Sequence, residues 1–69
     1  MVNGRVVAFD AHVGRGVIER ADGERLPFHC IEIMDGSRTV DVDAVVEFDT
    51  IAKLGRYEAA SIRTVLHVV

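Results

Sequence analysis

The chain has 69 residues, of which 49% are apolar and 28% are charged, and its net charge is −3. A chain this short has room for one domain, which we place over residues 1–69, and its apolar content excludes a disordered protein. The acidic total argues against tight, sequence-independent binding to duplex DNA, because such binding depends on neutralising many phosphates.

The first two short apolar runs are typical of β-strands. Residues 6–9 form the first run, which closes before Gly14, and residues 16–20 form the second. Asp22 and Gly23 follow, and an Asp-Gly pair between two alternating runs is a strong signal for a β-hairpin. We therefore expect the second strand to turn directly into a third.

The third predicted strand, residues 25–30, has two distinct faces. Pro27 lacks a backbone N–H, which places this strand at a sheet edge or at a bulge. Cys30 is expected to be buried as a small apolar side chain. The inward face holds Leu26, Phe28 and Cys30, and the outward face holds Arg25, Pro27 and His29.

A long polar loop over residues 34–39 precedes a fourth predicted strand over residues 45–51. This strand alternates again, so its side chains divide between a core face and a solvent face. The inward residues are Val46 and Phe48, and the outward residues are Glu47 and Asp49.

Gly55 marks a turn, and residues 57–65 form the fifth predicted strand, with Ala60 and Ile62 as expected core residues. An amphipathic helix over residues 53–66 is the alternative, since apolar residues there have roughly helical spacing. We rank this helix second because Gly55 would interrupt its first turn. Regularly spaced short strands without a long helix predict a closed all-β domain.

Several runs of the sequence resemble a known family. Residues 4–10 read GRVVAFD and residues 14–18 read GRGVI, which together resemble the opening of a bacterial cold-shock domain, G-x-V-K-W-F-N followed by K-G-F-G-F-I. Residues 26–33, LPFHCIEI, resemble the second family motif, V-F-V-H-F-S-A-I. Residues 36–40, GSRTV, resemble G-F-K-S-L, and residues 46–48, VEF, resemble the later V-x-F.

The resemblance implies an all-β fold, a five-stranded antiparallel OB-fold barrel of the cold-shock-domain type. It also implies binding of single-stranded RNA or DNA, which this family stacks on aromatic rings of its outer surface, at roughly 1–3 kcal/mol per base. The barrel positions that this chain retains are Val6, Gly14, Gly16, Ile18, Ile33, Val46, Phe48 and Ile62.

The departures from the family pattern fall on the stacking rings. Of the binding positions His29 is retained, and Phe9 lies beside the vacant tryptophan position. Losing several stacking platforms predicts weak binding unless other groups replace them. The replacements are Ala8 for the tryptophan, Arg15 and Val17 for the first-motif Phe residues, Pro27 and Cys30 for those of the second motif, and Ser37 for the loop Phe.

Each candidate binding residue has an alternative interpretation. The Arg15 guanidinium can stack on a base and pair with a phosphate, or it can be a solvated side chain paired with Glu19 or a neighbouring strand. His29 can stack on a base or donate to a phosphate, or it can be an ordinary surface histidine. Phe9 is either a remaining stacking ring or a core residue, which is the commoner fate of a lone Phe in a strand. The predicted nucleic-acid contacts are Phe9, Arg15, Val17, Pro27, His29 and Arg38.

No catalytic constellation, cofactor motif or metal site is expected, so we predict that the protein is not an enzyme. The residues His12, His29, Cys30 and His67 lack the paired spacing of zinc ligands. The single cysteine excludes an internal disulfide and fits a reducing compartment, so a cytoplasmic location is expected. No apolar run is long enough to span a bilayer, and no membrane partner is predicted.

Two functions remain open. The first is weak, salt-sensitive binding of single-stranded RNA or DNA on an outer β-sheet face. The alternative is an OB-fold protein-interaction module that has lost nucleic-acid binding, which the acidic segment over residues 32–49 favours. The apolar end over residues 65–69 also favours it, because an exposed strand edge can pair with a partner protein or with a second copy of the chain.

Overall fold

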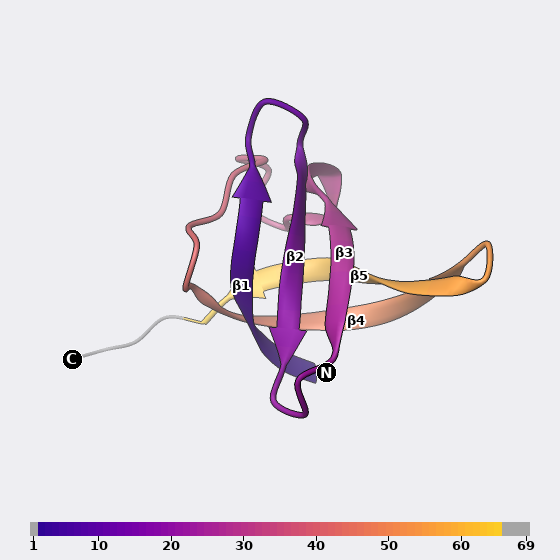
Figure 1. Ribbon diagram of the computed structural model, residues 1–69. Helices are drawn as coiled ribbons and strands as arrows, with labels where there is room; N and C mark the ends of the chain where they lie inside the picture. Colours follow the sequence, from indigo (N-terminus) through magenta and orange to yellow (C-terminus); the bar gives the residue numbers. More distant parts are fainter. Residues whose placement is uncertain (1, 66–69) are drawn as a thin grey trace.

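The computed structural model describes residues 2–65, which fold into antiparallel strands and one short 3-10 helix (Figure 1). Neighbouring strands pair in the order β3-β2-β1-β4-β5, which confirms the predicted all-β antiparallel fold class. The elements are β1 (Val2–Asp10), β2 (Arg15–Arg20), β3 (Arg25–His29), the 3-10 helix η1 (Cys30–Glu32), β4 (Val45–Lys53) and β5 (Arg56–Thr64).

The strands form two layers. In Figure 1, β1, β2 and β3 stand side by side, and the β4–β5 hairpin crosses behind them. At the ends of the sheet order, the segment directly after η1 joins β3 to β5: Ile33 forms a parallel bridge with Ile62, and the Met34 N–H donates to the Ile62 carbonyl at 2.9 Å. The position of β3 at one end confirms the edge that Pro27 predicts.

The alternative helix over residues 53–66 is wrong for the part that the structure describes. β4 continues to Lys53, the chain turns at Leu54 and Gly55, and β5 runs to Thr64. Gly55 has a φ of +85°, a left-handed conformation that glycine adopts without the steric cost of a Cβ atom. The turn glycine therefore ends one strand and begins the next, and residue 66 lies outside the described residues.

The core lies between the two layers and consists mainly of the side chains that the alternation places inward. Val46, Phe48, Ala60 and Ile62 are buried, as the sequence predicts. Burying a large apolar side chain contributes about 1.5–3 kcal/mol, so this set supplies much of the stability of a small domain. The other buried apolar residues are Val6, Ile18, Leu26, Phe28, Ile33 and Ala59.

The prediction that Cys30 is buried within the third strand is wrong. β3 ends at His29, and Cys30 begins η1, where its side chain is half-buried and packs against the edge of the core. The reason is local: the chain leaves the sheet after His29, so the two-residue alternation that would point Cys30 inward no longer applies.

A β-bulge in β1 reverses the alternation of that strand. Val6 is opposite Ile18, but Ala8 is opposite Val17, so Val7 is an extra residue. Because of this extra residue, Ala8 faces outward and Phe9 turns toward the core side. The bulge therefore determines which β1 side chain lies on the outer surface.

The inward turn of Phe9 allows two aromatic rings to meet across a glycine. Phe9 and Phe28 are both register partners of Gly16, and their rings are stacked with centroids 6.0 Å apart. A Cβ atom on Gly16 would lie 2.5 Å from Cζ of Phe28 and 2.7 Å from the Ala8 carbonyl oxygen. Only glycine leaves room at this position for the ring and the neighbouring strand.

Candidate nucleic-acid interface

The outer surface of β1, β2 and β3 carries two rows of side chains that run across the strands. In one row, Arg15 lies opposite both Asp10 on β1 and His29 on β3. In the other, Val17 lies opposite both Ala8 and Pro27. We call these six residues, Ala8, Asp10, Arg15, Val17, Pro27 and His29, the outer face. It brings together four of the six predicted contacts, including Arg15 and His29.

The row formed by Ala8, Val17 and Pro27 is apolar and shallow. Together with Arg15 and one side of Phe9, these residues line an open depression. Val17 and Pro27 are half-buried, so part of each side chain is accessible to a ligand. Their side chains offer no hydrogen-bonding group, and a flat ligand such as a base would contact this row by its face.

Phe9 lies at the edge of this depression rather than on the outer face itself. It is half-buried and packs against the core through its stack on Phe28. This geometry favours the core interpretation of Phe9, although the ring also borders the depression. Its role in binding stays a prediction.

Arg15 is exposed, and it makes no ion pair within 4.0 Å among residues 2–65. The predicted alternative, a pair with Glu19, is wrong, because Glu19 instead accepts from Nε of Arg25 at 3.0 Å. The nearest acid by register, Asp10, uses Oδ1 to accept the N–H groups of His12 and Val13 in the following turn. The Arg15 guanidinium therefore keeps its donors available for an external anion.

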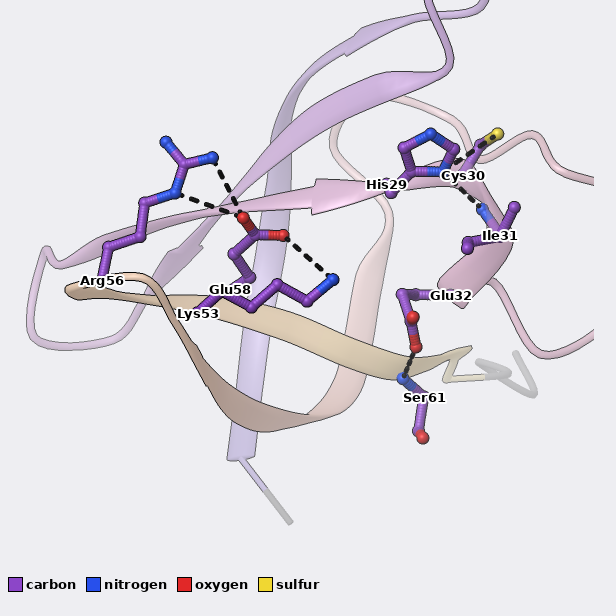
Figure 2. Close-up of polar contacts among 8 residues, drawn as sticks. All are labelled: His29, Cys30, Ile31, Glu32, Lys53, Arg56, Glu58 and Ser61. Atoms are coloured by element: carbon purple, nitrogen blue, oxygen red, sulfur yellow. Dashed lines mark hydrogen bonds and ion pairs between the residues drawn. The ribbon is translucent and has the colours of Figure 1, made fainter.

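His29 has a structural role that the sequence analysis did not anticipate. It is the N-cap of η1, and its Nδ1 accepts the N–H of Ile31 at 3.3 Å (Figure 2). In a neutral imidazole with Nδ1 accepting, the proton is on Nε2, so Nε2–H is a donor for a further partner. No sequence signal marks this cap, because histidine is not among the usual N-cap residues.

Arg38 lies apart from the register that aligns the other residues. It is exposed in the loop between η1 and β4 and has a φ of +60°. Just before it, Asp35 Oδ1 accepts the Ser37 N–H at 2.8 Å, and hydrogen bonds from Ser37 lower the pKa of Asp35 below its usual value of 3.8. The contacts that order this turn lie within the loop itself, so the assignment of Arg38 to the interface stays a prediction.

Two acidic side chains that the sequence analysis left unassigned make structural contacts, Glu58 within the β4–β5 hairpin and Glu32 between distant segments (Figure 2). Glu58 is buried and accepts from Nε and Nη2 of Arg56, at 3.2 and 3.0 Å, with Nζ of Lys53 at 4.0 Å. Glu32 accepts the N–H of Ser61 at 3.3 Å, and Ser61 has a φ of +52° inside β5. These carboxylates belong to the framework and not to a site.

The outer side of β1–β3 is more positive than the chain as a whole. Beyond the outer face, Arg5, Glu19 and Arg25 form a third row in register across the same strands. The three arginines of these rows outnumber the two acids, Asp10 and Glu19, whereas the whole chain carries −3. Arginines that are far apart in the sequence thus lie on one surface because their strands are paired.

Two classes of site are absent from the part of the chain that the structure describes. Residues 2–65 contain no group of three or more His, Cys, Asp or Glu side chains that could hold a metal ion. His67 lies outside these residues. Over the same range, no helix has the length and apolar character needed to cross a membrane.

Comparisons with known proteins place this geometry in context. The family model of the 'Cold-shock' DNA-binding domain matches residues 2–65. Among solved structures, one described as drosophila Unr CSD456 superposes with a TM-score of 0.80 at 29% sequence identity. That match covers 94% of this chain and 26% of the other, so this chain spans about a quarter of the length of the structure it resembles. No curated protein matches the sequence.

Proposed function

The chain belongs to the cold-shock domain family, and on that premise we propose that its outer face binds single-stranded RNA or DNA, weakly and in a salt-sensitive manner. The observation that carries this proposal is the register of β2: Arg15 lies opposite His29, and both border the apolar row at Val17. A cation and an N–H donor beside an apolar surface match the phosphate and the base of one nucleotide.

In this proposal each group of the outer face has a separate task. A base rests by its face on Val17 and Pro27, where the absence of hydrogen-bonding groups makes the contact tolerant of sequence. The Arg15 guanidinium pairs with a phosphate, and Nε2–H of His29 donates to a phosphate or sugar oxygen. The free donors of Arg15 support this division of roles.

Binding is weak because the apolar row of the outer face carries no aromatic ring. Ala8, Val17 and Pro27 provide less area for stacking than the rings that other members of the family present. Each missing ring removes up to about 1–3 kcal/mol of stacking. Phosphate neutralisation then provides a larger share of the affinity, which makes it sensitive to salt.

We also propose that the protein acts as a binding module and not as an enzyme. We further propose that it works in the cytoplasm, like the bacterial members of the family that its motifs resemble. The single cysteine and the open, shallow character of the outer face support this view. The alternative of a protein-interaction module depended in part on the apolar end of the chain, of which residues 66–69 lie outside the described residues.

Amide NMR titration with oligo-dT and oligo-U tests the proposal. At low salt we expect shifts at Arg15, Val17 and His29 that fade as salt rises, because each neutralised phosphate contributes about 0.7 to the slope of log affinity against log salt for a single strand. The variant Arg15→Gln should lower that slope by about 0.7. Arg63→Gln removes the same charge from β5, away from the β1–β3 layer and at a half-exposed ion pair, so it is the charge-matched control and should leave the slope unchanged. A titration without shifts at millimolar oligonucleotide would overturn the proposal.

A further inference from the structure

A second depression adjoins the outer face on the same side of the sheet. It is lined by Asn3, Gly4, Arg5, Glu19, Ala21 and Val45. Arg5 is the register partner of Glu19 on β2 and of Val45 on β4, so side chains of three strands meet here. Glu19 is two residues from Val17 on the same face of β2, which places the depression directly beside the apolar row.

The depression combines a donor and an acceptor that differ in how they are held. Glu19 is half-buried, and Arg25 fixes its carboxylate through the 3.0 Å contact between Nε and Oε2. Arg5 is exposed and makes no ion pair within 4.0 Å among residues 2–65. Directly opposite side chains on paired strands lie about 5 Å apart at Cβ. On paired strands, Glu19, whose carboxylate Arg25 holds, therefore lies opposite an arginine that makes no ion pair among residues 2–65.

This chemistry differs from that of the apolar row. The row can hold any base by its face, since Ala8, Val17 and Pro27 present no polar side-chain atom. The depression instead presents five donors on Arg5 and a carboxylate acceptor on Glu19, groups of the kind that read the edge of a base. Of the apolar row and the depression, only the depression offers polar side-chain groups that can distinguish one base from another.

We propose that this depression is a subsite for the edge of one guanine in the bound single strand, an inference that rests on the proposed function. Guanine carries two adjacent acceptors, O6 and N7, which match the forked donors of Arg5. It also carries two adjacent donors, at N1 and N2, which match the two oxygens of Glu19. Thymine and uracil present a single ring N–H between two carbonyl acceptors and cannot satisfy both side chains in this way.

The test compares oligo-dT with the same oligonucleotide carrying one central guanine, by fluorescence titration and amide NMR. The wild-type protein should bind the guanine-containing strand about fivefold more tightly, the lower end of the range for a good bidentate contact. Two analogues separate the contacts: 7-deazaguanine lacks the N7 acceptor for Arg5, and hypoxanthine lacks the N2 amino group for Glu19. Each should lose part of the preference.

Variants of Arg5 and Glu19 test whether each side chain contributes to the preference for guanine over thymine. Arg5→Gln should bring the guanine-to-thymine ratio close to one and remove the sensitivity to 7-deazaguanine. Glu19→Gln should have opposite effects on the two ligands: oligo-dT binds about twofold more tightly at low salt because a negative charge has left the surface, while the guanine preference falls. Asp41→Asn, the same charge change in an exposed loop, should leave the ratio unchanged.

The outcomes separate this inference from the proposed function. Equal wild-type affinity for the two oligonucleotides, or an unchanged ratio in Arg5→Gln, overturns the guanine subsite, while shifts at Arg15 and His29 with oligo-dT still support the proposed interface. A complete absence of binding to either strand overturns both. Arg5 is exposed, so its variant is expected to fold and keeps the test decisive even if Glu19→Gln is unstable.

Discussion

The two faces of the β1–β3 layer share one backbone and differ in almost every other respect. The inner face holds Val6, Ile18 and Phe28, which are fully or almost fully buried. The outer face alternates with it residue by residue and carries the small side chains of Ala8, Val17 and Pro27. Because successive residues of a strand point to opposite sides, the side chains that make the fold and those that make a binding surface can change independently.

The largest effect is expected from truncating the core. Phe48→Ala removes a side chain with 0% exposure and should lower the free energy of unfolding by about 3–5 kcal/mol, which is a large fraction of the stability of a 69-residue domain. Urea or thermal denaturation followed by circular dichroism measures this change. Tyr57→Ala, at a residue that is 63% exposed, is the control and should change stability by less than about 0.5 kcal/mol. Similar losses in both variants would mean that Phe48 is not a core residue.

Gly16→Ala is the next most disruptive change, because Gly16 is buried against the Phe28 ring and the backbone of β1. The new Cβ would overlap the Phe28 ring and the Ala8 carbonyl oxygen, and the strands must shift to accept it. We expect a loss of about 1–3 kcal/mol in denaturation experiments, typical of an overpacked core. Val17→Ala, one residue away but outward, serves as the comparison. An equal effect at Gly16 and Val17 would contradict the division into faces.

Restoring a ring to the outer face should strengthen binding without affecting the core. Val17→Phe adds an outward aromatic platform between Ala8 and Pro27, and we expect its affinity for oligo-dT to rise by about 1–3 kcal/mol, or about 5- to 150-fold. Its stability should stay within about 0.5 kcal/mol of the wild type. Val42→Phe, at a loop residue that is 51% exposed, controls for added hydrophobicity. A gain of the same size in both variants would show that the outer face is not the binding surface.

The core could be predicted from the sequence because it requires little more than apolar volume at every second position of each strand. Val46, Phe48 and Ile62 satisfy that requirement, and Gly55 marks the turn between the last two strands. Periodicity of two residues and turn chemistry are both local signals, so a single sequence carries them. The alternative helix over residues 53–66 was wrong for a related reason: Gly55 is a turn signal, and it outweighed the roughly helical spacing of the apolar residues around it.

The outer face was harder to predict because its arrangement depends on register between strands. The extra residue Val7 in β1 moves Ala8 outward and Phe9 toward the core, and alternation alone does not locate such a bulge. The pairing of Glu19 with Arg25 instead of Arg15 is likewise a contact between strands. Nothing in the sequence links Arg5 with Glu19, because only the pairing of β1 with β2 places them opposite each other.

The smallest effect is expected in the loop between η1 and β4, which belongs to neither face. Hydrogen bonds from Ser37 lower the pKa of Asp35 below 3.8, so the ionised carboxylate stabilises the folded loop above pH 3.8 and this contribution is lost as pH falls through the lower, folded-state pKa. NMR titration of the Ser37 amide should show a midpoint below 3.8 in the wild type and no such transition in Asp35→Asn. A midpoint at or above 3.8 would mean that the turn does not hold the carboxylate. Because Asp35 is exposed, bonds within its own loop and belongs to neither row of the outer face, Asp35→Asn should leave oligo-dT affinity unchanged, which separates loop order from the binding surface.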